Sequence, residues 1–473
     1  MTSPGYFASR FGLDEALLGR VVSRALDRGA EFAELFAQHR VSDAIGFEDG
    51  QVNRASTGVD LGVGVRALVG DQTGYAYTEE LTERSLLLAA ETAASIARGP
   101  RTASEGAIHT VALPRLYAPV PLWADIPAAD KIRFVERVGA AISGADPAIV
   151  RAGVAFGDED EAVLVANSDG LRVEDTRPMT YIYASCTARR GDRVESNSHS
   201  AAGRLGVEMY ADAFLDGLAG KTVASTLALF DARVPRAGEM PVVLAPATSG
   251  ILLHEAMGHG FEADFNRKGT SLFCTMLGRK VAADFVNIVD SALEPGARGA
   301  IAVDDEGTPG QRTALVENGA LVSYLHDRLS AAHYGVSRTG NGRRESFRSA
   351  PLPRMRVTTM ENGPHDPEEI IRSVERGLYA VDFANGEVDI GGGDYSFYVK
   401  SGFLIEGGRL TAPIKDVNLI GNGPDSLARI EMVGNDKAID PGTWTCGKDG
   451  QSVPVGLGLP TVKVRAITVG GVN

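Results

Sequence analysis

The pattern of apolar residues changes about halfway along the chain, at Arg233-Val-Pro-Arg-Ala-Gly238. Before this segment, stretches with helical spacing of apolar residues are interspersed with stretches in which every second residue is apolar. After it, short strands separated by Gly, Pro, Asn and Asp turns predominate, and long helices are few. The sequence therefore predicts an α+β protein of two domains, a mixed α/β N-terminal domain over 1–233 and a β-rich C-terminal domain over 234–473.

Several elements of the N-terminal half can be predicted from local patterns. Alternation from Val59 to Val65, followed by Gly70-Asp71, predicts a hairpin. Asn167-Ser-Asp-Gly170 predicts a tight turn between two strands, because Asn, Asp and Gly tolerate positive φ. The segment 114–127 is proline-rich and is expected to be irregular. Helices are expected over 14–28, 81–98, 128–142 and 211–229, and strands over 162–166, 171–173 and 179–188.

Charge and composition exclude several classes of function. The chain has 47 Lys and Arg against 61 Asp and Glu, a net charge of −14, which disfavours binding to nucleic acid or to an anionic membrane. Three cysteines among 473 residues cannot form a disulfide framework, so a reducing compartment is expected. The N-terminus lacks the pattern of a secretory signal, and no run of 18 apolar residues occurs. We expect a cytoplasmic protein that binds neither nucleic acid nor membrane.

Candidate catalytic chemistry lies just after the start of the second half. A short apolar strand at 241–244 leads into a helix that contains His254-Glu255-Ala-Met-Gly258-His259. Neutral imidazoles bind Zn²⁺, and a neighbouring carboxylate can accept a proton from water, so this combination is typical of a zinc peptidase helix. Composition and spacing alone indicate a possible metallopeptidase.

The spacing of the two histidines differs from the common zinc motif. Ligands at i and i+4 lie about 40° apart around an α-helix, whereas His254 and His259, at i and i+5, would lie about 140° apart. They cannot share a metal on a regular α-helix. Either a π-bulge rewinds the turn or the helix ends before His259, and Gly258 permits both.

A catalytic zinc site needs a third protein ligand, for which the sequence offers several candidates. Cys186 and Cys274 lie in apolar surroundings typical of core residues, whereas Cys446 lies in a polar, glycine-rich loop near Lys448, which would favour the thiolate. A free loop cysteine without a role is an equally good interpretation of Cys446. The other candidates are Glu262, Asp264, His326 and His333.

Five long segments, in order, resemble the TldD side of the TldD/PmbA family of metallopeptidases. The resemblance spans the chain and is strongest from Pro241 onward. The matching segments are Leu252–Glu262 with Asp264–Thr270, Asp304-Asp-Glu-Gly-Thr-Pro-Gly-Gln311, Thr339-Gly-Asn-Gly-Arg-Arg-Glu345, Glu431-Met-Val-Gly-Asn-Asp436 and Cys446-Gly-Lys-Asp-Gly-Gln-Ser-Val-Pro-Val-Gly456.

The resemblance implies a β-rich metallopeptidase domain at the C-terminus and a zinc-dependent peptidase that hydrolyses small or unfolded peptides, by leader-peptide removal or peptide degradation. It implies that His254, His259 and Cys446 bind Zn²⁺ and that Glu255 is the general base. It also implies a homodimer, or a heterodimer with a PmbA-like (TldE) paralogue. The rival hypotheses are a partner-dependent assembly chain with a structural zinc, closed by Glu262 or Asp264, and a metal hydrolase of non-peptide amides.

Two further segments allow opposing interpretations. The glycine-rich segment from Gly386 to Val399 could pair with an extended peptide by strand addition, or could form a bulge or hairpin turn, which we favour. Arg343, Arg344 and Arg348 could hold a substrate carboxylate, or could belong to a solvated or subunit-facing loop.

Overall fold

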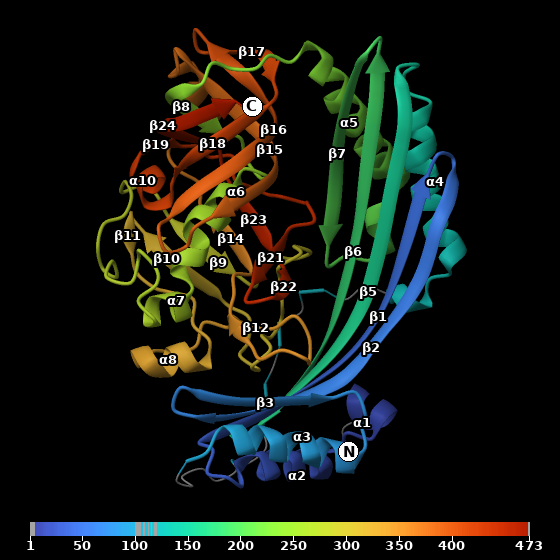
Figure 1. The fold of residues 1–473 in the computed structure, drawn as a ribbon, viewed down its shortest axis with the longest axis vertical. Helices are drawn as coiled ribbons and strands as arrows, with labels where there is room; N and C mark the ends of the chain where they lie inside the picture. The colour runs from blue at the N-terminus through green and yellow to red at the C-terminus, as the bar shows by residue number, and fades with distance from the viewer. Residues whose placement is uncertain are drawn as a thin grey trace.

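Two lobes face each other across the molecule: a long curved sheet with its helices, and a compact β-rich body (Figure 1). The first lobe comes from the N-terminal half of the chain and the second from the C-terminal half. The mixed α+β architecture predicted from the sequence is confirmed. This computed structural model describes residues 5–99, 106, 109–111, 113–114, 116–117 and 121–471, so that residues 115 and 118–120 of the expected proline-rich segment lie outside the described residues.

The N-terminal sheet is built from unusually long antiparallel strands. Its strand order is β3-β2-β1-β5-β6-β4, with β7 also paired to β6, and only β4 runs parallel to its neighbour. Asn167 forms the predicted turn between β5 and β6, where its side chain accepts hydrogen bonds from the backbone N–H groups of Asp169 and Leu171. The strands are β1 (Phe32–Glu48), β2 (Gln51–Val69), β3 (Gln72–Thr78), β4 (His109–Thr110), β5 (Ile149–Asn167), β6 (Leu171–Arg190) and β7 (Arg193–Gly203).

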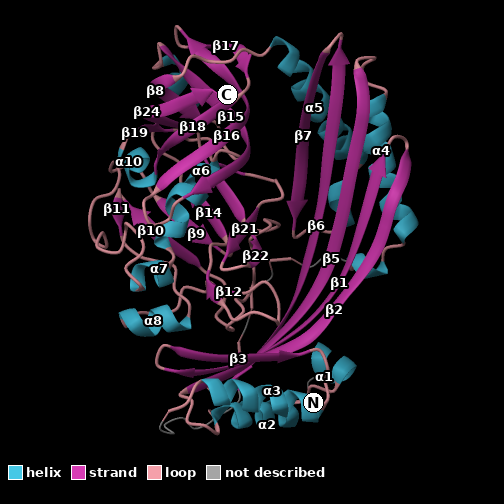
Figure 2. Ribbon diagram, viewed as in Figure 1, coloured by secondary structure: helices cyan, strands magenta, loops and turns pink. Residues whose placement is uncertain are grey.

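Helices cover this sheet at two places (Figure 2). The helices α1 (Tyr6–Phe11), α2 (Glu15–Leu26) and α3 (Glu83–Ile96) pack at one end, while α4 (Ala128–Ser143) and α5 (Asp212–Ala228) pack along the other. The four helices predicted over 14–28, 81–98, 128–142 and 211–229 are confirmed. The stretch Asp212–Asp231 is long and apolar enough to cross a membrane, but 44% of it is buried in the protein, and soluble core helices share this property.

The C-terminal lobe contains two larger sheets around one core. In one of them, β15, β8, β24, β18 and β16 pair in turn, and β16 pairs back to β15, so the strands close into a ring. The other has the order β11-β10-β9-β14-β23-β20. The strands are β8 (Gly238–Leu244), β9 (Ile288–Ser291), β10 (Arg312–Glu317), β11 (Ala320–Leu321), β12 (Gly342–Arg343), β13 (Leu352–Pro353), β14 (Val357–Met360), β15 (Arg376–Val388), β16 (Asp394–Glu406), β17 (Arg409–Ile414), β18 (Val417–Asn422), β19 (Ile430–Val433), β20 (Ala438–Ile439), β21 (Thr445–Lys448), β22 (Gln451–Pro454), β23 (Gly456–Leu459) and β24 (Val462–Gly471).

Short helices connect these strands. They are α6 (Gly250–Leu253), α7 (Ala263–Arg267), α8 (Arg328–Tyr334), α9 (Pro367–Arg372) and α10 (Gly423–Ala428). The glycine-rich segment forms a hairpin between β15 and β16, as we favoured. Asp389 accepts a hydrogen bond from the backbone N–H of Gly391, and Gly393 takes a φ of 77° that glycine adopts without strain.

Two residues of the arginine cluster, Arg344 and Arg348, join the two lobes, and the third is buried within the C-terminal lobe. Arg344 is buried and donates to Glu34 of the N-terminal sheet at 2.6 Å. Arg348 pairs with Asp60 at 2.9 Å on the surface of the same sheet. Arg343 is buried as well and donates to the backbone carbonyl of Met355 at 2.7 Å. The guanidinium groups of Arg343 and Arg344 are therefore occupied inside the molecule and are not open to a substrate, whereas Arg348 is exposed, as the prediction of a solvated loop expected.

Candidate metal centre

A π-helical turn places the two motif histidines on one side of their helix. The chain leaves β8, forms α6 and continues into the π-helical turn η4 (His254–Gly258), in which the His259 N–H donates to the His254 carbonyl. A bond from residue i+5 to residue i brings side chains five apart onto one face, which a regular α-helix cannot do. Of the two predicted solutions to the i, i+5 spacing, the structure has the π-bulge.

Gly258 is required in this turn by close packing. A β-carbon at this position would lie 2.2 Å from the sulfur of Met355, far inside van der Waals contact. The sequence suggested that Gly258 loosens the helix, but its φ of −59° is ordinary helical backbone. The glycine instead leaves room for the buried side chain of Met355, which lies between β13 and β14.

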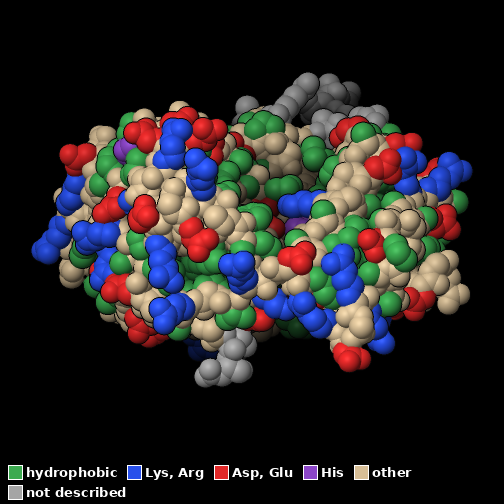
Figure 3. All heavy atoms as spheres, turned by 90° about the horizontal axis from the view of Figure 1, so that it is seen from above, with side chains coloured by type: hydrophobic (Ala, Val, Ile, Leu, Met, Phe, Trp, Pro, Cys, Tyr) green, Lys and Arg blue, Asp and Glu red, His purple; other side chains and the backbone are tan. Residues whose placement is uncertain are grey.

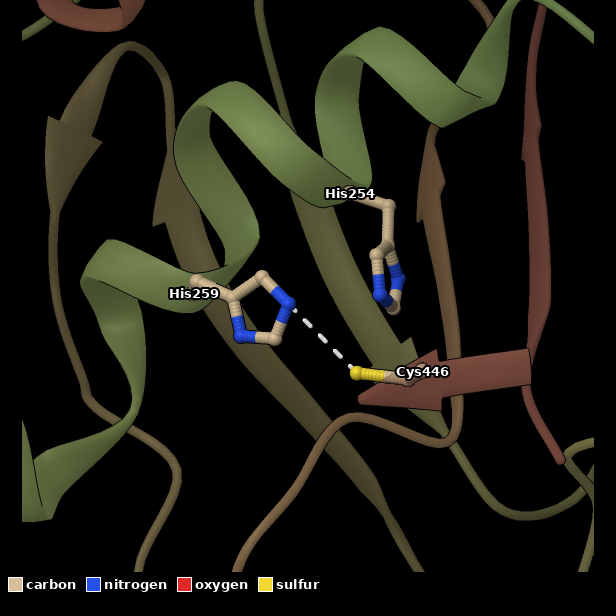
Figure 4. A group of neighbouring side chains, drawn as sticks. All are labelled: His254, His259 and Cys446. Atoms are coloured by element: carbon tan, nitrogen blue, oxygen red, sulfur yellow. Dashed lines mark hydrogen bonds between the residues drawn. The ribbon is translucent and has the colours of Figure 1, made fainter. Parts of the chain in front are cut away.

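Three side chains converge at this point from two distant parts of the chain (Figure 4). His254 and His259 come from the π-helical segment, and Cys446 comes from β21. Their potential ligand atoms all lie within 4.8 Å of one another, and His259 Nε2 is 3.4 Å from Cys446 Sγ. All three residues are buried, with exposed fractions of 1%, 4% and 1%.

His254 has unsatisfied polar atoms that fit a metal ligand. Neither of its ring nitrogens has a hydrogen-bond partner among the described residues, although the side chain is buried. An unpaired buried polar group is costly, so such a group calls for a partner. Two imidazoles and a thiolate are a donor set typical of zinc, and they leave one position of a tetrahedron open. The residues present therefore fit a catalytic metal site.

Electrostatics favours the ligating form of the thiol. Burial alone would raise the pKa of Cys446, but the neighbouring His254 and His259 outweigh it and hold that pKa well below its usual value. Burial lowers the pKa of His259, whereas Glu262 and Cys446 raise it more, and the net shift is well upward. A metal binding here would displace protons, which makes binding pH-dependent.

A carboxylate and a lysine behind His259 fix its orientation. Glu262 Oε2 lies 2.9 Å from His259 Nδ1, so Nε2 faces Cys446. Burial would raise the pKa of Glu262, but Lys448 and His259 lower it to about 2. Lys448 Nζ donates to Glu262 at 3.1 Å, to Asp264 at 2.7 Å and to the carbonyl of Pro353 at 2.9 Å. A carboxylate that orients a metal-ligating histidine is a common arrangement in metal sites.

The other candidate ligands predicted from the sequence do not join the trio. Glu262 and Asp264 are bound to Lys448, which the sequence had suggested as a partner of the thiolate. His333 is exposed on α8, and His326 is buried elsewhere, where burial lowers its pKa to about 4. Cys186 is a buried core residue of the N-terminal lobe, in agreement with its predicted packing role.

The hairpin that carries Cys446 is held by a buried arginine that the sequence did not reveal. Arg354 is fully buried and donates to the carbonyls of Cys446 at 2.5 Å and Gln451 at 3.3 Å, one on each strand of the β21–β22 hairpin. Arg298 donates to the carbonyl of Trp444 at 3.0 Å, just before the hairpin. No local pattern signals these contacts, because their partners lie 92 to 146 residues away in the chain.

Of the trio, His259 lines an open cleft that also contains Glu255. The cleft has a volume of about 670 Å³ and is lined by His259, Glu255, Gly447 and the tip of the β15–β16 hairpin. Glu255 Oε2 lies 3.6 Å from His259 Nε2, and its side chain is 23% exposed. The predicted base thus lies between the candidate metal ligands and solvent, where a substrate can enter.

Family models of the PmbA/TldA metallopeptidases match three consecutive segments of the chain. Domain 1 matches residues 33–97, the central domain matches 121–230, and the C-terminal domain matches 237–471. The last of these contains His254, His259 and Cys446.

Known proteins that resemble this chain over most of its length carry related names. A metalloprotease TldD homologue of Haemophilus influenzae is 36% identical over 454 residues, 94% of each chain. A zinc metalloprotease TldD homologue of Saccharolobus solfataricus is 27% identical over 96% of this chain and 99% of its own. The crystal structure of TldE from Thermococcus kodakarensis has the same fold, with a TM-score of 0.77 at 20% identity over 96% of this chain and all of its own. The chain therefore belongs to the PmbA/TldD family of metallopeptidases.

Proposed function

We propose that this chain is a zinc-dependent peptidase that hydrolyses small or unfolded peptides. The observation that carries the proposal is the convergence of His254, His259 and Cys446 within 4.8 Å, at the edge of a cleft that also contains Glu255. The name of the Saccharolobus relative, a zinc metalloprotease, supports zinc as the metal.

In this proposal the trio holds Zn²⁺ and the fourth side faces the cleft. Zinc supplies a Lewis acid that polarises a carbonyl and lowers the pKa of water toward ~7. Cys446 is held as a thiolate by the two histidines, and a thiolate donates more charge than a third imidazole would. Glu262 keeps the Nδ1 proton of His259 turned away from the metal position.

Glu255 is the proposed general base and then the general acid. Its carboxylate adjoins His259 Nε2 and is partly exposed in the cleft, so it can reach both a water molecule and a substrate. It would accept the proton of the attacking water and return it to the leaving amine, a role that contributes about 10²- to 10⁴-fold to a rate.

The cleft fits an extended peptide better than a folded protein. It lies between the β15–β16 hairpin and the β21 hairpin, so a chain can enter but a globular domain cannot reach the buried trio. We further propose that the protein works in the cytoplasm as a dimer, either with itself or with a TldE-like paralogue, since its fold is shared by TldE of Thermococcus. Leader-peptide removal and peptide degradation are both compatible with such a cleft.

A structural zinc in a partner-dependent assembly chain is the rival proposal. It requires a fourth protein ligand, for which Glu262 and Asp264 were the candidates. Both carboxylates are bound to Lys448, and Glu262 contacts the Nδ1 side of His259, away from the cysteine. This geometry favours the catalytic proposal. Hydrolysis of non-peptide amides would use the same groups and differs only in substrate.

The deciding experiment compares the wild-type chain with Glu255→Gln, each alone and with the TldE-like paralogue. We expect one zinc per chain in both proteins by elemental analysis, with peptide hydrolysis reduced about 10²-fold or more in the variant. Glu317→Gln, at an exposed glutamate on β10, is the matched control and should leave both readouts unchanged. Full activity in Glu255→Gln would remove its role as the base, and no turnover of peptides or of small amide substrates under any condition would contradict the enzyme proposal.

A further inference from the structure

A second cavity, of about 600 Å³, lies where the edge of the N-terminal sheet meets the C-terminal lobe. One wall is formed by β6, β7 and α5, and the other by β15, β16 and the loop that precedes β21. Seen from above, the surface is hollowed between the two lobes, and Lys or Arg and His side chains lie within the hollow (Figure 3). We call this cavity the interlobe pocket.

Two lysines enter the interlobe pocket from opposite walls. Lys221 is exposed on α5, and Lys400 is partly buried on β16. Lys400 Nζ donates to the hydroxyl of Ser198 at 3.0 Å and to its carbonyl oxygen. Within the part of the chain that the structure describes, neither ammonium group forms an ion pair, so both charges are available to an anion.

The two carboxylates of the pocket are engaged by other donors. Asp382 accepts a hydrogen bond from the hydroxyl of Ser401 at 3.0 Å. Asp440 accepts from the indole N–H of Trp444 and from the backbone N–H of Gly442, and burial raises its pKa. These acids therefore do not neutralise the lysines by direct contact.

The lysine charges shift the pKa values of neighbouring titratable groups. Burial lowers the pKa of His199 to about 4, and Lys221 and Lys400 lower it further, against an opposing effect of Asp382. Burial likewise lowers the pKa of Lys400 to about 8, with Lys221 adding to the shift and Asp382 opposing it. The charges of both lysines thus reach the interlobe pocket, where Asp382 offsets part of them.

Two segments run from the interlobe pocket to the metal cleft. On β15, residues 381–384 line the pocket, whereas 387–390 line the cleft. On the β21 hairpin, Trp444 and Thr445 line the pocket, Gly447 lines the cleft, and Cys446 lies between them. At about 3.3 Å per residue, the five residues from Phe383 to Val388 span roughly 17 Å, the length of about five residues of extended peptide.

We propose that the interlobe pocket is a substrate subsite in which Lys221 and Lys400 bind a carboxylate of an extended peptide whose scissile bond lies at the metal centre. The proposal rests on the peptidase function and adds a substrate class to it. Preferred substrates carry an acidic side chain or a free C-terminal carboxylate about five residues from the scissile bond, because that spacing matches the path along β15. In this subsite the carboxylate contacts two ammonium groups that form no ion pair within the described residues, which gives a charge-assisted contact.

The test uses the full-length, zinc-loaded Glu255→Gln variant, in which cleavage is slowed so that peptide binding can be measured. Labelled Gly/Ser/Ala peptides of about twelve residues carry one Asp at varied positions, or none, with a free or an amidated C-terminus. Fluorescence anisotropy should show roughly tenfold tighter binding for a correctly placed carboxylate, the effect of about 1.4 kcal/mol. The amidated series separates a side-chain carboxylate from a terminal one.

Variants at the lysines decide the proposal. Lys221→Met with Lys400→Met should abolish the preference for acidic peptides and leave binding of the neutral peptide unchanged. Lys280→Met, at an exposed lysine paired with Asp284, is the matched control. Because Lys221 is exposed, Lys221→Glu is expected to fold even if Lys400→Met does not, and it should reverse the preference toward peptides that carry lysine.

The outcomes also separate this proposal from the proposed function. A preference for acidic peptides that survives both lysine variants, or the lack of any such preference in the parent protein, overturns the subsite. If the wild-type chain cleaves peptides but its kcat/KM is the same for acidic and neutral peptides, the peptidase function stands and the subsite proposal is wrong. Lysine-dependent peptide binding without any hydrolysis would support the pocket and contradict the peptidase.

Discussion

Two of the buried polar clusters in the molecule differ in how completely they are paired. Between the lobes, Glu34 accepts from Arg66 at 2.9 Å and from Arg344 at 2.6 Å, and Arg66 also donates to Glu306 at 2.6 Å. At the metal centre, His254 is as deeply buried but contacts no hydrogen-bonding partner among the described residues. Each charged group of the interlobe cluster therefore has a partner of opposite charge, although Arg66 Nε and Arg344 Nε have no hydrogen-bond partner, whereas neither ring nitrogen of His254 has a partner among the described residues.

This difference gives a criterion for function that burial alone does not provide. Both clusters contain charged or polar side chains with almost no exposed surface, and such groups are stable only when they are paired. Charges that are matched within the protein mainly hold its parts together. A nitrogen left without a partner beside a thiol and a second imidazole indicates a ligand site. The comparison predicts that substitutions at the metal centre change zinc content and activity, whereas substitutions in the interlobe cluster change the free energy of unfolding.

The largest effect is expected for Cys446→Ser. The serine hydroxyl is a poor zinc ligand at neutral pH, so zinc content should fall from about one per chain to near zero, and peptide hydrolysis should be lost with it. The fold should persist, because the interlobe pairs are untouched. Elemental analysis, circular dichroism and a peptide assay measure the three quantities.

Cys274→Ser is the matched control for this change, since Cys274 is a free, half-buried cysteine that lies outside the trio. It should keep zinc and activity at the wild-type level. Unchanged zinc occupancy and affinity in Cys446→Ser would remove Cys446 from the site and would weaken the distinction between the two clusters.

The converse change is Arg344→Met in the interlobe cluster. It leaves Glu34 with one buried partner in place of two, and breaking a buried ion pair typically costs about 3–5 kcal/mol of the free energy of unfolding. Denaturant unfolding of the zinc-loaded protein measures this loss, while zinc content at saturating metal should stay near one per chain.

Arg348→Met is the control for the interlobe cluster, because this arginine makes ion pairs with Asp60 and Glu79 at the surface. Exposed pairs contribute about 0–1 kcal/mol, so its unfolding curve should nearly coincide with that of the wild type. Equal losses in Arg344→Met and Arg348→Met would show that burial of the interlobe charges carries no special weight.

Local sequence patterns predicted the elements whose stability is local. The helix α2 was predicted because its apolar residues recur at helical spacing, and the β2–β3 hairpin because its strands alternate; in the structure Asp14 also caps α2. The strand β1 was missed. It lies in the middle of the N-terminal sheet, and its first eight residues are all buried, so no alternation marks it. The strands β5 and β6 were predicted shorter than they are, as 162–166 in place of 149–167, and as two pieces, 171–173 and 179–188, in place of 171–190.

The residues of the candidate site likewise fall into those that local sequence predicted and those that it did not. His254, Glu255 and His259 stand together in the sequence, and their spacing already required a π-bulge or the end of the helix. Cys446 could be assigned only by resemblance to a family, because 187 residues separate it from His259. The contacts of Lys448 with Glu262 and Asp264 also join distant segments, so the sequence offered these acids as ligands when they serve as supports.

The smallest effect is expected at Glu262, where the two kinds of cluster meet. Its carboxylate is paired with Lys448, as in the interlobe cluster, yet it also orients His259 at the metal centre. Glu262→Gln keeps the shape and one hydrogen bond but removes the charge, and loss of such a supporting carboxylate typically weakens metal binding about 10- to 100-fold. Competition with a chromogenic chelator measures this affinity.

The control is Asp264→Asn. Asp264 contacts the same lysine but not His259, so this change should weaken zinc binding less than Glu262→Gln. If both variants bind zinc equally well, Glu262 acts only as a partner of Lys448. The metal centre is then held by other contacts, such as the hydrogen bond from Arg354 to the carbonyl of Cys446.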